Sequence, residues 1–171
     1  MADDGRFLTE ENGEIKEERA INVSTGAGDA DKIPRTDAGG KLDITFMPNG
    51  IGDDSVSMTT FEDLNAGDWV NVFDDSGTVK LRKADATTVG KEVTGFVSAS
   101  STAPAVNTVF FEGVNASNAG LSLGVTYWLS TTAGGEVTTA PSSSGNIVQK
   151  VGKSLSLTEI AFEPSNPIEK V

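Results

Sequence analysis

Short segments of alternating apolar and polar residues, separated by clusters of turn-forming residues, dominate this sequence. Clusters of Gly, Asn, Asp and Ser interrupt the chain roughly every 8 to 15 residues, and no long helical periodicity follows about residue 20. Gly accounts for 19 of the 171 residues, and Val and Thr recur throughout. Because β-branched side chains pack well on a pleated surface, this pattern predicts short strands. We therefore expect an all-β fold, either a small barrel or a sandwich.

The clearest expected hairpin joins residues 68–73 to residues 78–83. Residues 74–77 form its four-residue loop, in which Gly77 can take a positive φ. Further strands are expected over residues 92–99, 105–112, 125–130, 135–139 and 146–152. In the last strand region, residues 154–162, the apolar alternation changes phase, which predicts a turn or bulge within it.

The chain divides near residue 55 into an apolar-poor first part and a strand-rich second part. Residues 1–55 carry 13 acidic and 6 basic side chains, and their large apolar residues are scattered among Gly and Asp. Such a segment buries too little apolar surface to offset its chain entropy, so we expect an extended N-terminal arm. Within the arm, residues 10–19 can form a short helix with Thr9 as its N-cap. Residues 56–163 should form the β-rich domain and residues 164–171 a C-terminal tail.

The residue types that the chain lacks restrict its chemistry. There is no Cys and no His, which excludes a disulfide, a thiolate nucleophile, a Cys/His zinc site and a His general base. The net charge of −12 argues against nucleic-acid binding. No run of about 18 apolar residues predicts a membrane-spanning helix, and the first residues do not resemble a signal peptide. We expect no cofactor, no metal and no enzymatic activity.

Three short motifs resemble functional sites but lack residues that those sites need. Residues 151–154 (VGKS) resemble the end of a phosphate-binding loop, yet Ile147 stands where that loop needs Gly, and no helix pattern follows. The Asp pairs at 53–54 and 74–75 do not fit the spacing of a calcium loop. We interpret the first motif as a strand and turn, and the Asp pairs as turn residues, with a weak cation site as the alternative.

Three aromatic residues, Trp69, Tyr127 and Trp128, allow two interpretations. On strands with alternating neighbours, aromatic side chains usually belong to a core or to a subunit interface. The alternative is a platform on which a sugar ring stacks.

Two groups of motifs resemble virion proteins of tailed bacteriophages. Residues 29–43 (DADKIPRTDAGGKLD) and 47–52 (MPNGIG) are similar to a segment of small head-decoration proteins and of some tail-fibre proteins. Five later stretches resemble capsid cement or decoration proteins: residues 66–72 (AGDWVNV), 79–86 (VKLRKADA), 94–97 (TGFV), 109–113 (VFFEG) and 120–130 (GLSLGVTYWLS). The likeness covers about residues 29–163, and residues 1–28 lie outside it.

This resemblance implies a capsid decoration protein, of the cement or head-fibre type, with a small β-rich fold. Such a protein is made in the host cytoplasm, binds the outer surface of the phage head in the virion and stabilises it. The implied partners are the major capsid protein and further copies of the same chain, in a homotrimer. Neither nucleic acid nor a membrane is an implied partner, and the matching motifs carry no catalytic signature.

Attachment without chemistry also agrees with the composition of the arm. A segment that orders on a partner loses entropy, but it can follow a long contact path. We predict that apolar and proline residues of the arm bind the capsid or a neighbouring subunit: Ile33, Pro34, Leu42, Ile44, Phe46, Met47, Pro48 and Ile51.

Two other classes of protein remain as alternatives. The same arm pattern occurs in tail fibres, so a tail-fibre or receptor-binding subunit of the virion is the first alternative. The second is a carbohydrate-degrading enzyme, which needs two carboxylates that face each other across a cleft. Nothing in the sequence selects such a pair.

Overall fold

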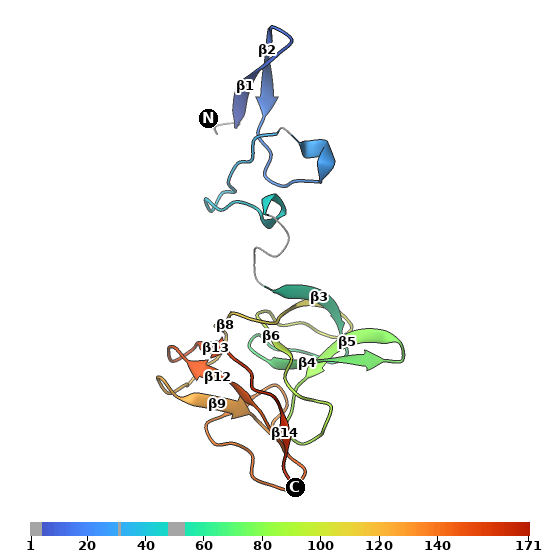
Figure 1. Cartoon of the computed structure of the whole chain (residues 1–171), viewed down its shortest axis with the longest axis vertical. Helices are drawn as coiled ribbons and strands as arrows, with labels where there is room; N and C mark the ends of the chain where they lie inside the picture. Colours follow the sequence, from blue (N-terminus) through green and yellow to red (C-terminus); the bar gives the residue numbers. More distant parts are fainter. Residues whose placement is uncertain (1–4, 31, 48–53) are drawn as a thin grey trace. The chain divides into compact units, whose positions relative to one another are not determined.

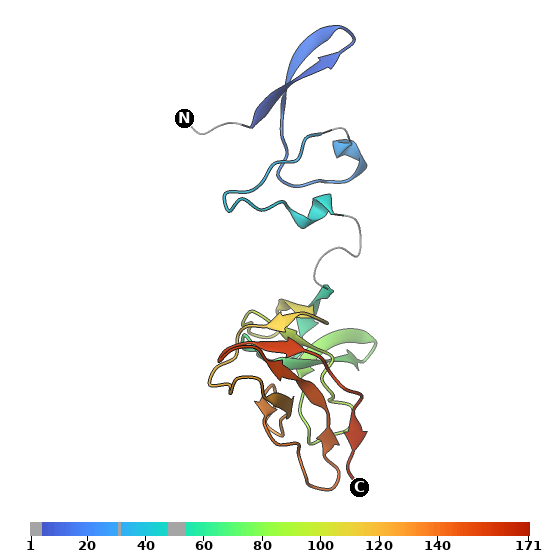
Figure 2. The same ribbon diagram turned by 60° about the vertical axis from the view of Figure 1, so that its left-hand side comes forward.

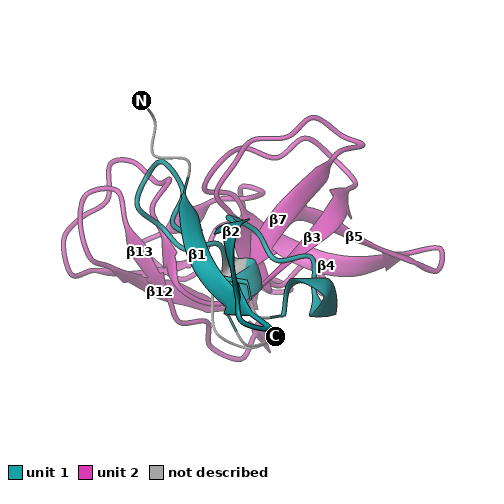
Figure 3. Ribbon diagram, turned by 90° about the horizontal axis from the view of Figure 1, so that it is seen from above, with its two compact units in different colours: residues 1–52 teal, residues 53–171 magenta. Residues whose placement is uncertain are grey.

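The chain folds into two compact units. A computed structural model describes residues 5–30, 32–47 and 54–171. Unit 1 comprises Met1–Gly52 and unit 2 comprises Asp53–Val171 (Figure 3). Apart from two short 3-10 turns in unit 1, the regular elements of the described residues are strands (Figure 1). The predicted all-β class is therefore confirmed.

Five strands of unit 2 close into a barrel. The order around the barrel is β3-β5-β4-β6-β7. Its strands are β3 (Ser55–Thr60), β4 (Trp69–Asp75), β5 (Thr78–Lys83), β6 (Gly95–Val97) and β7 (Val106–Phe110). Closure depends on β3, which pairs antiparallel with β7 and parallel with β5. Because the barrel is closed, each of its strands has two neighbours and no edge is left free.

A second sheet of unit 2 has five short strands in the order β10-β9-β12-β13-β8. They are β8 (Val114–Asn115), β9 (Thr126–Leu129), β10 (Glu136–Val137), β12 (Lys150–Ser154) and β13 (Ile160–Phe162). Strands β12 and β13 are drawn in shades of red in Figure 2. The change of phase expected within residues 154–162 is explained by the turn between β12 and β13, where Ser154 lies opposite Ile160.

A two-stranded ribbon corrects two of the expected boundaries. Strand β11 (Ile147–Val148) pairs with β14 (Ile168–Glu169), so the strand expected over residues 146–152 is divided between β11 and β12. The prediction of a plain tail over residues 164–171 is wrong at β14. Backbone pairing explains the difference, because the Lys170 N–H donates to the Asn146 carbonyl at 2.8 Å.

Two barrel strands bury side chains on both of their faces. Successive residues of a strand point to opposite sides of the sheet. Val70 of β4 and Val97 of β6 therefore point into the barrel, where they pack with Leu64, Leu81 and Val109. Their neighbours Trp69 and Phe96 point outward into a second core, which they share with apolar residues of the second sheet: Tyr127, Leu129, Val151, Ile160 and Phe162. The barrel and the second sheet are thus joined by a common core.

The hairpin between β4 and β5 has a tighter turn than the sequence suggested. Asp75 pairs with Thr78, which leaves only Ser76 and Gly77 in the loop. Both loop residues have positive φ, 55° and 89°. This is the requirement of a type I′ turn, whose twist matches that of the flanking strands. The prediction of a four-residue loop is wrong because the two Asp residues continue the strand.

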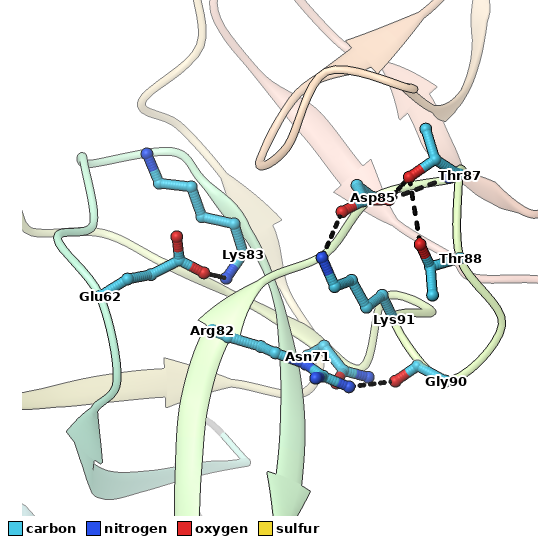
Figure 4. A network of polar contacts seen from close by, with 9 residues as sticks. All are labelled: Glu62, Asn71, Arg82, Lys83, Asp85, Thr87, Thr88, Gly90 and Lys91. Carbon is cyan, nitrogen blue, oxygen red and sulfur yellow. Dashed lines mark hydrogen bonds and ion pairs between the residues drawn. The ribbon is translucent and has the colours of Figure 1, made fainter.

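A polar network fixes the loop after β5 (Figure 4). Asp85 is buried, pairs with Lys91 Nζ at 2.9 Å and accepts the Thr87 backbone N–H at 2.9 Å. Burial alone acts to raise the pKa of Asp85, but the hydrogen bonds from Thr87 and Lys91 outweigh it and lower that pKa below its usual value. Arg82 of β5 donates through its Nε–H to Asn71 Oδ1 at 2.9 Å and through Nη2 to the carbonyl oxygen of the loop residue Gly90 at 2.5 Å. The loop is therefore tied to the barrel by charged and polar side chains.

Unit 1 begins with a β-hairpin where the sequence was compatible with a helix. Strands β1 (Arg6–Glu11) and β2 (Glu14–Arg19) pair antiparallel across the two-residue turn Asn12-Gly13. The turn residues have φ of 56° and 83°, as a type I′ turn requires. The predicted helix over residues 10–19 is wrong because Asn-Gly strongly favours this turn, whereas Gly inside a helix destabilises it by roughly 1 kcal/mol.

The other described residues of unit 1 form loops with two short 3-10 turns, η1 (Ala27–Asp29) and η2 (Ile44–Phe46). Ile21 and Pro34 form an isolated parallel bridge. Around it, the Ile21 N–H donates to the Ile33 carbonyl at 3.0 Å. These few backbone bonds define the path of the chain without forming a sheet.

Candidate partner-binding surface

The described residues of unit 1 form no core. None of the side chains described between residues 5 and 47 is buried, whereas unit 2 has two clusters of buried apolar residues. Six large apolar side chains of unit 1 are exposed: Leu8, Ile15, Val23, Ile33, Leu42 and Met47. Unit 1 therefore has ordered backbone structure, and its apolar surface remains available for contact with another molecule.

The eight residues predicted to bind a partner lie in two parts of unit 1. Ile33 and Pro34 are exposed and adjoin the bridge to Ile21. The other described residues belong to η2 or flank it: Leu42 and Met47 are exposed, Phe46 is half-buried, and Ile44 lies within η2 with its side chain outside the description. Pro48 and Ile51 lie outside the described residues. The η2 segment is tied to the earlier loop by the Ser24 N–H, which donates to Thr45 Oγ1 at 2.8 Å.

Acidic side chains of unit 1 stabilise its loops. Thr25 donates its backbone N–H at 2.6 Å and its hydroxyl at 2.7 Å to Asp29 Oδ2. Thr45 makes the same two bonds to Asp43 Oδ1, at 2.9 Å and 2.7 Å. The backbone bond and then the hydroxyl bond lower the pKa of each carboxyl below its usual value. These two residues of the motif that resembles phage proteins therefore shape the loops and stay ionised.

The β1–β2 hairpin adds an apolar surface that the sequence analysis missed. Leu8 and Ile15 are diagonal neighbours on one face of the hairpin, because Leu8 lies opposite Glu17 and Ile15 lies opposite Glu10. Their exposed fractions are 71% and 74%. On the other face, Glu18 forms an ion pair of 3.0 Å with Lys32 of the following loop. The first face is thus the one that is open to a partner.

The signal for this surface was present in the sequence. Asn12-Gly13 lies between two six-residue segments, and Asn-Gly is a strong local indication of a hairpin. With that turn in place, the alternation of a strand puts Leu8 and Ile15 on one face. The assignment of residues 10–19 to a helix concealed this arrangement.

Two of the three aromatic residues singled out in the sequence, Trp69 and Tyr127, belong to the core of unit 2. Trp69 is fully buried, and its ring centroid lies 5.9 Å from that of Phe96 and 5.3 Å from that of Phe162. Tyr127 is buried in the same cluster, whereas Trp128, the next residue in β9, is half-buried. The core interpretation is confirmed for Trp69 and Tyr127.

The other motifs belong to strands and turns. Residues 151–154 lie in β12, where a Cβ on Gly152 would lie 1.9 Å from the Ala161 carbonyl oxygen. Gly152 is needed for close strand packing. In the β4–β5 hairpin, Asp74 Oδ1 accepts the Gly77 N–H at 2.7 Å and Asp75 pairs with Lys80 Nζ at 2.7 Å. Asp53 lies outside the described residues, and within those residues no three acidic side chains gather as a metal site would require.

Comparisons with known proteins assign no family to the chain. No protein-family model matches the sequence, and no curated protein matches it. Among the described residues, no helix has the length and apolar character needed to cross a membrane. The contacts of the described residues are therefore the basis for the functional proposal below.

Proposed function

We propose that this protein is a structural protein of a bacteriophage virion that decorates the capsid. Unit 1 attaches to the major capsid protein on the outer surface of the head, unit 2 is displayed there as a β domain, and the attachment stabilises the shell. One observation carries the proposal: unit 1 has regular backbone structure but no buried side chain among its described residues. The resemblance of residues 29–43 and 47–52 to phage proteins names the class of partner.

The physical argument is that unit 1 needs additional contacts to be stable. A two-stranded hairpin alone is marginally stable in water at best. Within the described residues the β1–β2 sheet has no third strand, and Leu8 and Ile15 stand exposed on one face. Burial of about 300 Å² of apolar surface on a partner would contribute about 7 kcal/mol at roughly 25 cal/mol per Å², before the cost of ordering. Many copies on one shell would add avidity.

Self-association is part of the same proposal. A homotrimer would place three hairpins close together and would let their free strand edges and apolar faces be covered by neighbouring copies. Sedimentation equilibrium of the purified chain measures this directly. A trimeric mass supports the arrangement, and a monomer at all accessible concentrations would contradict a trimer that forms without the shell.

The central experiment adds variants to capsid shells that lack this protein. Deletion of residues 1–50 should abolish binding, and the double variant Ile33→Asp/Met47→Asp should weaken it by at least about tenfold, which corresponds to roughly 1.4 kcal/mol. Val79→Asp is the matched control, because Val79 is an exposed apolar residue of unit 2. Undiminished occupancy by the deletion variant would overturn the proposal.

Antibody labelling of intact particles then locates the chain. Labelling over the whole head supports decoration. Labelling confined to the tail tips would replace it with the tail-fibre alternative.

A further inference from the structure

An open pocket of unit 2 lies between the β9–β10 pair and the loop before β9. It is lined by the loop residues 119–122, by Tyr127 of β9 and by residues 136–139 of β10 and its extension. Its volume is about 540 Å³, within the range of about 300–1,000 Å³ that is usual for small-molecule sites. The pocket belongs to unit 2 and takes no part in the attachment proposed above.

A half-buried carboxylate, that of Glu136, lines this pocket. Glu136 Oε2 accepts the indole N–H of Trp69 at 2.8 Å, and Trp69 is itself fully buried. Burial raises the pKa of Glu136 above its usual value, and the nearby charge of Asp68 raises it further, while the Trp69 hydrogen bond opposes the shift. The carboxylate thus stands where water solvates it poorly.

Glu136 forms no ion pair with a Lys or Arg of the described residues, and no cation contributes to the shift of its pKa. Lys83 pairs with Asp68 at 3.3 Å, and Lys150 pairs with Glu163 at 3.4 Å. Lys80 and Lys91 are paired on the barrel and its loop. Because a partly desolvated carboxylate without a cation is unfavourable, a positive group that entered the pocket would gain a charge-assisted hydrogen bond.

Residues with hydroxyl groups also line the pocket. The Ser122 backbone N–H donates to the Tyr127 hydroxyl oxygen at 2.8 Å, so that oxygen sits at a fixed position. Thr138 and Thr139 add two hydroxyl groups, and Leu121 and Val137 add apolar surface. A ligand with several N–H donors and a short apolar stem would match this combination.

We propose that the pocket binds a small organic cation with N–H donors, an ammonium or a guanidinium, and that Glu136 is its charge partner. Anions are disfavoured by Glu136 and Asp68. A metal ion is disfavoured because Ca²⁺ takes six to eight oxygen ligands, and the described residues contain no cluster of three acidic groups. The cation is either a free amine or the end of a Lys or Arg side chain on another protein.

The two Trp residues of the chain provide the readout. In the full-length protein labelled with ¹⁵N, the Trp69 indole signal reports on Glu136, and the Trp128 indole signal serves as an internal reference. Addition of ethylguanidinium or ethylammonium should shift the Trp69 signal with saturation and should lower the pH at which this signal titrates. Sodium chloride and tetramethylammonium chloride at equal ionic strength should do neither, because neither cation has an N–H donor.

Variants and a second ligand complete the test. Glu136→Gln keeps an acceptor oxygen for Trp69 but removes the charge, and it should lose the saturable shift. N-acetyl-arginine methylamide distinguishes the sources: tighter binding than ethylguanidinium assigns the site to a protein side chain, and weaker binding assigns it to a free amine. The proposal is overturned if tetramethylammonium shifts the Trp69 signal as ethylguanidinium does, or if the Glu136→Gln variant retains the shift. It is also overturned if glucose, an uncharged ligand, produces the same shift.

Discussion

Two hairpins of this molecule share one turn type and differ in whether their strands contain buried residues. Asn12-Gly13 joins β1 to β2 in unit 1, and Ser76-Gly77 joins β4 to β5 in unit 2, and all four turn residues have positive φ. Beyond the turn, β4 buries Trp69, whereas neither β1 nor β2 has a buried residue. Local sequence thus suffices to specify a hairpin, but only packing makes it stable.

The contrast extends to how each unit satisfies its polar and charged groups. In unit 2, the charged side chain of Asp85 is buried and pairs with Lys91 in the loop after β5 (Figure 4). In unit 1, the ion pairs of the hairpin are solvent-exposed, for example Lys16 with Glu11. Exposed pairs contribute about 0–1 kcal/mol, so they cannot replace a core. Unit 2 therefore has buried clusters and a buried ion pair that the described residues of unit 1 lack.

Truncation of a core residue should have the largest effect on the free energy of unfolding. Trp69→Ala removes the side chain at the centre of the second core and should lower the free energy of unfolding of unit 2 by about 3–5 kcal/mol. Leu8→Ala removes a large side chain from unit 1 and should change the same quantity by less than about 0.5 kcal/mol. Urea unfolding followed by circular dichroism measures both. Equal losses in the two variants would show that unit 1 contributes to a common core.

A single methyl group in a close strand contact should have the next largest effect. Gly152→Ala places a Cβ against the Ala161 carbonyl oxygen, so β12 and β13 must shift, at a cost of about 1–3 kcal/mol. Gly28→Ala is the matched control, because a Cβ there meets nothing within 4 Å and the φ of Gly28 is not positive. If thermal unfolding shows that Gly152→Ala is as stable as Gly28→Ala, the close contact between β12 and β13 at Gly152 is contradicted.

The same Gly→Ala substitution can be compared in the type I′ turn of each unit. A Cβ at Gly13 or Gly77 meets nothing within 4 Å, so the substitution to Ala acts only through the positive φ. Gly77→Ala should cost unit 2 about 1–2 kcal/mol. Gly13→Ala should leave that stability unchanged and should instead reduce the cross-strand nuclear Overhauser effects of β1–β2. A loss of unit 2 stability in Gly13→Ala would contradict this expectation.

The smallest expected effects are those of pH on unit 2. The pKa of Asp85 is lower in the folded protein than its usual value of 3.8, so the unfolded chain binds more protons in the pH range below that value. The stabilising contribution of Asp85 is therefore present above about pH 4 and is lost as the pH falls. Asp85→Asn should flatten this acid limb of a plot of stability against pH. An unchanged slope would show that other carboxyl groups determine it.

Glu136 should act with the opposite sign. Its folded pKa is raised, so the folded state binds more protons than the unfolded chain between the usual Glu pKa and the raised one. Its ionisation therefore lowers stability as the pH rises through that range. Glu136→Gln should raise the unfolding temperature at neutral pH, with no gain below the usual Glu pKa. A destabilised variant at neutral pH would contradict this assignment.

Local patterns in the sequence were sufficient for the fold class and for much of the barrel. Strands β4, β5, β6 and β7 lie within or overlap the expected segments, because alternation and turn residues are local signals. The sequence analysis missed β3, although Val56 and Met58 alternate with Ser and Thr. Its parallel pairing with β5 joins Thr60 to Leu81, and such distant contacts follow from the burial of one common core, which no local pattern contains.

The candidate surface was only partly accessible to sequence reasoning. Ile33, Leu42 and Met47 were selected as apolar residues of a poorly packed segment, and the structure leaves them exposed. Leu8 and Ile15 were missed because residues 10–19 were assigned to a helix and the Asn12-Gly13 turn was not considered. The pocket combines residues 119–122 with residues 136–139, and its Glu136 accepts a hydrogen bond from the distant Trp69, so only the folded chain brings these residues together.

Residue-resolved amide hydrogen exchange of the free full-length chain, at a concentration where it is monomeric, tests whether unit 1 is stable without a partner. We expect strong protection for amides of β4, β5 and β12, whose strands enclose the two cores, and almost none for β1 and β2. Protection of β1 and β2 equal to that of β4 in the monomer would contradict this expectation, because unit 1 would then be stable without a partner.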